Sequence, residues 1–274
     1  MKTVKGLHEK MGTFENANTS FHQAARCKRY TNEVLAFSMV KEEELLRATE
    51  EIQNLTYRQG EYKIFKVFEP KERLIMALPF YDRVVQHMIC NAIQPVFENG
   101  FYYHSYACRS GKGMHAASDT LYQWMYETEV KQGLRMYAFK GDISKYFASI
   151  PHDKLKDENR SYIGDKKAIM LMDDIIDHNG ILPDGVGIPV GNLTSQLFAN
   201  VYGNKLDKFC KHVLHIPYFV RYMDDFIILS DDLEQLKEWV KRIEEFLENE
   251  MLLHINPKST ILYAGNGIDF CGYI

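Results

Sequence analysis

The sequence predicts an α+β fold, and three features support this prediction. A β-branched and aromatic run from Phe219 to Leu229 is interrupted by two acids, which predicts two strands joined by a tight turn. Residues Leu233–Leu247 place apolar side chains at three- and four-residue spacing, which predicts an amphipathic helix. Along the chain, the order strand, helix, hairpin, helix, strand is typical of an α+β protein.

The first part of the chain, residues 1–60, is predicted to be helical. Its clearest segment, Val34–Leu55, carries acids early and apolar residues at helical spacing, and Gly60 follows it. Two strands come next, because residues 62–68 alternate at period two and residues 74–78 form a second apolar run after a charged turn.

The remaining elements follow from the same periodicities and from the turn and cap residues between them. Helices are predicted at 83–97, at 114–126, from Pro151 onward, and from Asn192 to about Val213. Strands are predicted at 134–143, 253–255, 261–263 and 268–273.

Three carboxylates stand out within these elements. Asp224 and Asp225 interrupt the apolar hairpin and are costly to bury unpaired, so we expect them at its tip. Asp142 ends the strand predicted at 134–143. Carboxylates that converge from neighbouring strands are what two-metal phosphoryl transfer requires, and Mg²⁺ is the cation that such ligands hold best. An ordinary acidic turn is the alternative for Asp224 and Asp225 alone.

The segment Tyr222-Met223-Asp224-Asp225 resembles the catalytic box of reverse transcriptases, and Asp142 stands where that family keeps its first palm aspartate. The resemblance covers most of the chain beyond about residue 60. Its other motifs are Lys71-Glu72-Arg73-Leu74-Ile75, Phe80-Tyr81-Asp82-Arg83-Val84-Val85-Gln86-His87, Tyr106-Ala107-Cys108-Arg109-Ser110-Gly111-Lys112-Gly113, Val190-Gly191-Asn192-Leu193-Thr194-Ser195-Gln196, the lysine motif at Lys258, and Phe270-Cys271-Gly272-Tyr273.

The motif Val190-Gly191-Asn192-Leu193-Thr194-Ser195-Gln196 discriminates between subgroups. Related enzymes of mobile introns carry Gln-Gly at its start and Ser-Pro at its end, whereas this version resembles the diversity-generating retroelement group. That resemblance implies copying of a template RNA into cDNA with many errors at adenines, with a small basic accessory protein as partner. Two alternatives stay open: a phage-defence or retron-like reverse transcriptase that copies a non-coding RNA, and a catalytically idle RNA-binding scaffold.

The resemblance also implies a right-hand polymerase fold of fingers and palm. The chain ends at Ile274, directly after the primer-grip motif, so we expect the thumb to be missing or truncated. The implied domains are an N-terminal helical extension at 1–60, fingers at 61–138, a first part of the palm at 139–155, a connection between fingers and palm at 156–186, and palm with catalytic hairpin and primer grip at 187–274.

The family pattern assigns each matching residue an expected role. Asp142, Asp224 and Asp225 are the expected catalytic residues, and with Ile143 they are expected to hold two Mg²⁺ ions, for which Mn²⁺ can substitute. One ion would activate the primer 3′-hydroxyl, and the other would hold the dNTP and the leaving pyrophosphate. The expected nucleotide-binding residues are Lys71, Arg73, Phe147, Gln196 and Lys258. The expected template and primer contacts are Arg109, Lys112, Tyr222, Met223, Cys271 and Gly272.

Several of these residues have a plainer alternative role. Phe147 is either a steric gate against the ribose 2′-hydroxyl or an ordinary core residue. Lys258 is either a general acid for the leaving pyrophosphate or a surface lysine. Lys71 and Arg73 either clamp the triphosphate or lie on a solvated turn.

Composition fits this assignment except in one respect. The net charge of −4 is unusual for a protein that binds nucleic acid. Acids cluster at 42–44 and 231–250 and can form a solvated face. The five cysteines form no Cys-x-x-Cys pair, which argues against zinc and a disulfide framework. No apolar run reaches the ~20 residues of a membrane span, and no secretory signal opens the chain, so we expect a cytoplasmic protein.

Overall fold

The computed structural model describes residues 3–68 and 72–273, and the chain divides into two compact units. Unit 1 contains residues 1–100 and 151–198, and unit 2 contains residues 101–150 and 199–274. The segment predicted as fingers, 61–138, is therefore divided between the two units. We describe each unit by itself.

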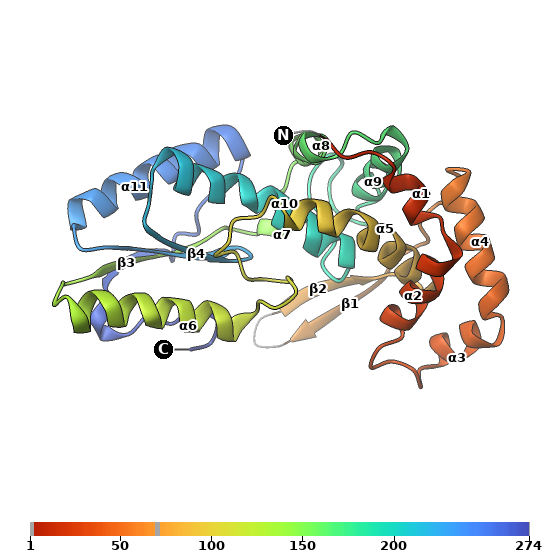
Figure 1. Ribbon diagram of the computed structural model, residues 1–274, viewed down its shortest axis with the longest axis horizontal. Helices are drawn as coiled ribbons and strands as arrows, with labels where there is room; N and C mark the ends of the chain where they lie inside the picture. The colour runs from red at the N-terminus through yellow and green to blue at the C-terminus, as the bar shows by residue number, and fades with distance from the viewer. Residues whose placement is uncertain (1–2, 69–71, 274) are drawn as a thin grey trace. The chain divides into compact units, whose positions relative to one another are not determined.

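Unit 1 is mainly helical. Its helices are α1 (Leu7–Met11), α2 (Phe14–Ala24), α3 (Asn32–Met39), α4 (Lys41–Gln53), α5 (Phe80–Glu98), α8 (His152–Tyr162), α9 (Lys166–Asp177) and the first part of α10 (Leu193–Lys208). The strands β1 (Lys63–Phe68) and β2 (Glu72–Ala77) pair antiparallel (Figure 1). Helices α1 and α2 pack on the long helix α5, and the rings of Phe21, Phe37 and Phe80 form an aromatic core.

Two expectations for unit 1 were wrong in detail, and one helix was missed. The predicted helix Val34–Leu55 is two helices, because the backbone turns at Val40, which has φ −122° and ψ 26°. Glu72 and Arg73 were expected in a turn, but they belong to β2, where Arg73 pairs with Val67. Helix α9 was not predicted, although Asp165 caps it by accepting hydrogen bonds from Lys167 N and Ala168 N.

Unit 2 is built on a four-stranded antiparallel sheet with the strand order β4-β5-β3-β6. The strands are β3 (Tyr137–Asp142), β4 (Tyr218–Tyr222), β5 (Asp225–Ser230) and β6 (Thr260–Tyr263). Helix α6 (Met114–Met125) covers one face of the sheet, and α11 (Leu233–Phe246) covers the other (Figure 1). The short helix α7 (Tyr146–Ser149) follows β3, and α10 continues in this unit from Ala199.

Both faces of this sheet are buried. Ala117 and Leu121 of α6 pack with Val220, Ile227 and other apolar side chains of the sheet. On the opposite face, α11 buries the side chains of Leu236, Val240 and Ile243. Because the central strands β3 and β5 are covered on both sides, their register is strongly specified.

The structure also corrects three expectations for unit 2. The hairpin turn consists of Met223 and Asp224 rather than of the two acids, since Asp225 already belongs to β5. The predicted strand 268–273 is a tight reversal, in which Phe270 pairs with Tyr273. Cys271 and Gly272 between them have φ values of 56° and 81°. The predicted strand 253–255 is reduced to an isolated bridge between Ile255 and Ile143.

No helix in the two described stretches, 3–68 and 72–273, is long and apolar enough to cross a membrane.

Candidate active site

The backbone of unit 2 brings the three predicted acids together. Asp142, the last residue of β3, and Asp225, the first residue of β5, are direct cross-strand partners. Asp224 lies in the adjoining turn, and its carbonyl oxygen accepts a hydrogen bond of 3.2 Å from the Ile143 amide. Directly opposite residues of an antiparallel pair have Cβ atoms about 4.5–5.5 Å apart. The three residues thus occupy one end of the central strand pair, and all three are partly exposed.

A glycine makes this register possible. Gly141 precedes Asp142 and pairs with Phe226, whose ring is fully buried. A Cβ atom at Gly141 would lie 2.4 Å from the tip of that ring. Any larger residue would therefore push β3 away from β5 beside the Asp142–Asp225 pair.

The Asp142 carboxylate is held by a residue that the sequence analysis missed. Asn256 donates from its side-chain amide to Oδ2 of Asp142 at 2.6 Å, and its backbone amide donates to the Asp142 carbonyl at 2.7 Å. Ser259 Oγ accepts from the Asp142 amide at 3.0 Å. The Asn256-Pro257 dipeptide is a turn signal that could have drawn attention to this segment.

Lys258 lies in the same segment. Its side chain is exposed, and its backbone amide donates to Asn256 Oδ1 at 3.1 Å. Lys258 is thus two residues from Asn256, which binds the Asp142 carboxylate. A contact between Lys258 and a nucleotide is a proposal.

Phe147, the predicted steric gate, lies on α7, the short helix that follows β3. Its ring is partly exposed, and it meets the buried Tyr146 ring edge-on at 6.0 Å. Tyr146 is anchored because its hydroxyl donates to the Ala199 carbonyl at 2.7 Å. The Phe147 ring is therefore partly exposed to solvent, and the residue before it, Tyr146, is held in place by its hydrogen bond.

The residues assigned to the primer adjoin the acids. Burial raises the pKa of the Cys271 thiol to about 12, and the Asp225 carboxylate adds to the shift. Burial also raises the pKa of Tyr222, with Cys108 and Cys271 as smaller contributors. Tyr222 and Cys271 pack against the same apolar cluster of unit 2. Gly272 is exposed next to Cys271, and Met223 is buried in the turn itself.

Arg109 and Lys112, the predicted template contacts, hold their own loop. Arg109 Nη1 donates to the carbonyls of Tyr102 and Ser105 at 2.8 and 2.7 Å. Lys112 Nζ donates to the Tyr103 carbonyl at 2.9 Å and lies 3.6 Å from the centre of that ring. Both side chains thus stabilise the segment 101–112 through hydrogen bonds to its backbone. A contact of either side chain with template phosphate is a proposal.

Of the other predicted nucleotide-binding residues, Arg73 and Gln196 belong to unit 1. Lys71 lies outside the described residues, and Arg73 is exposed on β2. Gln196, in the first turn of α10, lines a cavity of about 200 Å³ together with Arg83, Gln86 and His87. Burial lowers the pKa of His87, which favours its neutral ring. The cavity thus joins two of the family motifs.

The discriminating Val190-Gly191 pair also packs within unit 1. The Val190 carbonyl accepts a hydrogen bond of 3.0 Å from the Met76 amide of β2. Gly191 has φ 120°, and a Cβ atom there would lie 3.0 Å from the Met76 carbonyl oxygen. Only glycine fits this close approach without strain.

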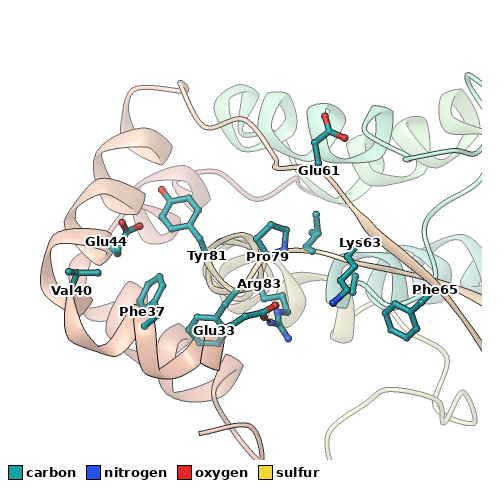
Figure 2. A pocket seen from close by; sticks show the side chains of 14 residues that line it. Glu33, Phe37, Val40, Glu44, Glu61, Lys63, Phe65, Pro79, Tyr81 and Arg83 are labelled. Carbon is teal, nitrogen blue, oxygen red and sulfur yellow. Dashed lines mark hydrogen bonds and ion pairs between the residues drawn. The ribbon is translucent and has the colours of Figure 1, made fainter. Parts of the chain in front are cut away.

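Figure 2 shows a larger cavity of unit 1, of about 790 Å³, which no motif predicted. Phe37 of α3, Val40 between α3 and α4, Phe65 of β1 and Tyr81 of α5 contribute its apolar lining. The charged side chains in its lining are Glu33, Glu44, Glu61, Lys63 and Arg83, and Arg83 is paired with Glu33. This mixture of charges gives no preference for an anionic ligand, so we assign the cavity no part in nucleotide binding.

The chain is similar in sequence to several curated proteins. Among curated proteins, the chain is 24% identical to protein YkfC of Escherichia coli, with 70% of this chain and 60% of that protein covered. It is 31% identical to an uncharacterised 91 kDa protein in the cob intron of Schizosaccharomyces pombe, with 48% of this chain and 16% of that protein covered. The chain thus spans less than two thirds of either relative.

The similar solved structures are telomerases. The apo telomerase of Candida tropicalis, truncated from its C-terminal domain, has a TM-score of 0.56 and 14% identity, with 74% of this chain and 49% of that chain covered. The telomerase of Candida albicans in complex with a telomeric RNA fragment has a TM-score of 0.54 and 12% identity, with 76% and 44% covered. The predicted right-hand polymerase fold with fingers and palm is confirmed.

The family itself is established from the sequence match. A family model described as reverse transcriptase (RNA-dependent DNA polymerase) matches residues 66–274, which is most of the chain. These residues include the acids of the hairpin, the paired Asp142 and the Val190–Gln196 motif. The chain belongs to the reverse transcriptase family.

Proposed function

We propose that the protein is an RNA-directed DNA polymerase that makes cDNA on a template RNA, with Asp142, Asp224 and Asp225 as its catalytic carboxylates. The observation that carries this proposal is the register of β3 and β5, which makes Asp142 and Asp225 cross-strand partners beside the turn that holds Asp224. Such a cluster of partly exposed acids at a strand end is unfavourable unless a cation offsets the charge.

The donor set suits Mg²⁺. The three carboxylates and the Ile143 carbonyl supply hard oxygen ligands, which Mg²⁺ prefers. Among the described residues, no group of three or more aspartate, glutamate, histidine or cysteine side chains is arranged so that it could hold a metal ion. The proposed site does not require such a group, because Mg²⁺ is usually bound by one or two carboxylates together with water and substrate phosphates. When bound, it would stabilise charge on the transferring phosphoryl group and activate the attacking hydroxyl.

The protein's own residues would complete the site. Phe147 would exclude the ribose 2′-hydroxyl, Asn256 would fix the Asp142 carboxylate, and Lys258 would protonate the leaving pyrophosphate. In this proposal, unit 2 carries the palm chemistry. Arg73 and Gln196 are proposed to contact the incoming nucleotide and the templating base, as the resemblance implies.

A primer-extension assay tests the proposed activity. The purified chain, a primed RNA of defined sequence and dNTPs should give cDNA with Mg²⁺, and no product once EDTA exceeds the metal. Replacing dNTPs with NTPs should give little product. Extension that persists in excess EDTA, or no extension under any metal condition, would overturn the proposal.

We further propose that the enzyme belongs to the diversity-generating retroelement group and is error-prone at template adenines. The features that support this are Val190 and Gln196, which depart from the Gln-Gly and Ser-Pro of more accurate relatives. A loosened pocket wall lowers the difference in transition-state binding between correct and incorrect nucleotides. The net charge of −4 supports a small basic accessory protein as partner, because the chain alone attracts phosphate weakly.

Sequencing the cDNA made from a defined RNA tests the subgroup. We expect errors to concentrate opposite adenine and to fall in the variant Val190→Gln/Gln196→Pro. Errors spread evenly over the four template bases, or unchanged in the variant, would instead favour a defence-type reverse transcriptase.

A further inference from the structure

A fully buried ion pair lies beneath the catalytic turn, and no motif used above assigns it a role. Arg221 of β4 and Asp207 of α10 both have fully buried side chains. They form a two-pronged contact, in which Nε donates to Oδ1 at 2.6 Å and Nη2 donates to Oδ2 at 2.7 Å. An isolated buried ion pair is expensive to desolvate and is weak evidence for stability. The presence of this pair is therefore better explained by a role other than stability.

The remaining contacts of the Arg221 guanidinium supply that explanation. Nη1 donates to the carbonyl oxygen of Met223 at 2.8 Å, and Nη2 also donates to Ser105 Oγ at 3.1 Å. Met223 is the first residue of the hairpin turn and directly precedes Asp224. Arg221 therefore reaches past Tyr222 and fixes the carbonyl from which the Asp224 backbone continues.

The turn needs such a contact. Met223 has φ +58°, a left-handed conformation that residues other than glycine rarely adopt. Its side chain is buried, so water cannot easily replace Arg221 as the partner of the polar backbone. A charged donor is among the strongest partners for a buried carbonyl, and Asp207 keeps that donor oriented. The hydrogen bond from Arg221 to the Met223 carbonyl thus stabilises the strained backbone of the turn.

The residues around the Arg221 guanidinium leave space for it and restrict its movement. Gly203 of α10 faces it, and a Cβ atom there would lie 2.6 Å from Arg221 Nη1 and 2.9 Å from the Tyr146 hydroxyl. The Arg221 backbone is bonded on both sides to the neighbouring segment, because its amide donates to His104 O and its carbonyl accepts from Tyr106 N, each at 3.0 Å. Arg221 can therefore move little without displacing the segment that leads to Arg109.

We infer that Arg221 and Asp207 are positioning residues: the pair holds the Met223 carbonyl so that the turn presents the Asp224 carboxylate to the metal ion. This inference rests on the proposed function, because it concerns the same carboxylates. Neither side chain contacts solvent, so neither is expected to touch the nucleotide, the template or the metal. The pair would act only through the turn.

The sharpest test replaces the pair by apolar residues, in the double variant Arg221→Met/Asp207→Leu. Apolar replacement of a buried ion pair is often neutral for stability, so this variant should fold. Loss of a residue that orients a metal ligand typically costs about 10–100-fold in metal affinity or activity. We expect a rise of that size in the Mg²⁺ concentration for half-maximal cDNA synthesis, with the melting temperature little changed.

A second measurement separates this inference from the proposed function. Binding of Mn²⁺, followed by electron paramagnetic resonance, does not require polymerase activity. The double variant should bind Mn²⁺ more weakly than the unmodified chain, and Asp224→Asn should weaken binding at least as much. If the unmodified chain makes no cDNA but these Mn²⁺ affinities differ as expected, the proposed activity fails while the positioning role stands.

Two further variants guard against misfolding and non-specific effects. Gly203→Ala would displace the guanidinium while leaving both charges in place, and it carries the test if the double variant does not fold. Tyr102→Phe is the matched control, because it removes a 3.0 Å hydrogen bond to the Phe219 carbonyl of the same strand without touching the turn. The inference would be overturned if folded Arg221→Met/Asp207→Leu or folded Gly203→Ala kept its Mn²⁺ affinity and its Mg²⁺ dependence within twofold of the unmodified chain. It would also be overturned if Tyr102→Phe lost as much Mn²⁺ affinity as these variants.

Discussion

Replacing Gly141 with alanine should damage both the fold and the site, because it acts at the register that gathers the acids. The new Cβ atom would lie 2.4, 2.7 and 2.7 Å from three atoms of the Phe226 ring. That ring cannot withdraw easily, since it is fully buried between Phe139 and Phe219 at centroid distances of 5.8 and 6.0 Å. Overpacking of this kind typically costs about 1–3 kcal/mol.

Two measurements check this prediction. Thermal unfolding should show a melting temperature lowered by about 2–4 °C per kcal/mol, the value for domains of roughly 150–250 residues. Primer extension, measured below the unfolding transition, should fall by about tenfold or more, which corresponds to roughly 1.4 kcal/mol in the transition state. The activity should fall because β3 must shift from β5 beside Asp142.

The control and the rescue make the prediction specific. Gly12→Ala places its Cβ atom 2.8 Å from the flexible Gln53 side chain in unit 1, so it should leave activity unchanged. Gly141→Ala/Phe226→Leu opens space for the new methyl group and should recover part of the activity. Unmodified stability and activity in Gly141→Ala would refute the reasoning, because the Phe226 ring would then yield without cost.

The remaining predictions concern single side chains. Phe147→Val should raise the use of NTPs relative to dNTPs by about tenfold, and an unchanged ratio in competition assays would make Phe147 a core residue. Asn256→Ala removes the 2.6 Å hydrogen bond to Asp142 and should raise the Mg²⁺ requirement about 10–100-fold; an unaltered Mg²⁺ titration would contradict this. Burial, with two nearby lysines, lowers the pKa of His104 to about 4, so the stability from its neutral ring is present above the unfolded-state pKa of about 6.5 and is lost as pH falls toward 4. Denaturant unfolding at pH 7 and pH 5 should therefore show a smaller loss of stability in His104→Gln than in the unmodified chain, and equal losses would argue against a half-buried neutral ring.

The sheet of unit 2 was largely predictable, because local pattern and tertiary environment agree there. Strands β4 and β5 are apolar runs broken by a turn, and strands buried on both faces read as such runs. The amphipathic helix predicted at Leu233–Leu247 is confirmed by α11, which buries one face against the sheet. The meeting of Asp142 with the hairpin was expected from its place near the end of a predicted strand, and the resemblance supported that expectation.

The expectations that failed depended on backbone conformation. The reversal at Cys271-Gly272 needs two successive positive φ values, and nothing in the apolar pattern of 268–273 signals them. The break at Val40 interrupts a continuous helical periodicity. The contacts of Arg221 with Asp207 and the Met223 carbonyl join residues whose proximity only the fold creates. Local sequence carries little information about such contacts.

Magnesium-dependent cDNA synthesis by single Asp→Asn variants tests the central claim most directly. The substitution keeps the shape of the side chain and removes the charge that would hold the ion. We predict that Asp142→Asn, Asp224→Asn and Asp225→Asn fold normally and lose nucleotide incorporation on an RNA template. The exposed control Asp231→Asn, just past the end of β5, should retain it. Incorporation at the unmodified rate by any of the first three variants, or an equal loss in the control, would contradict the account.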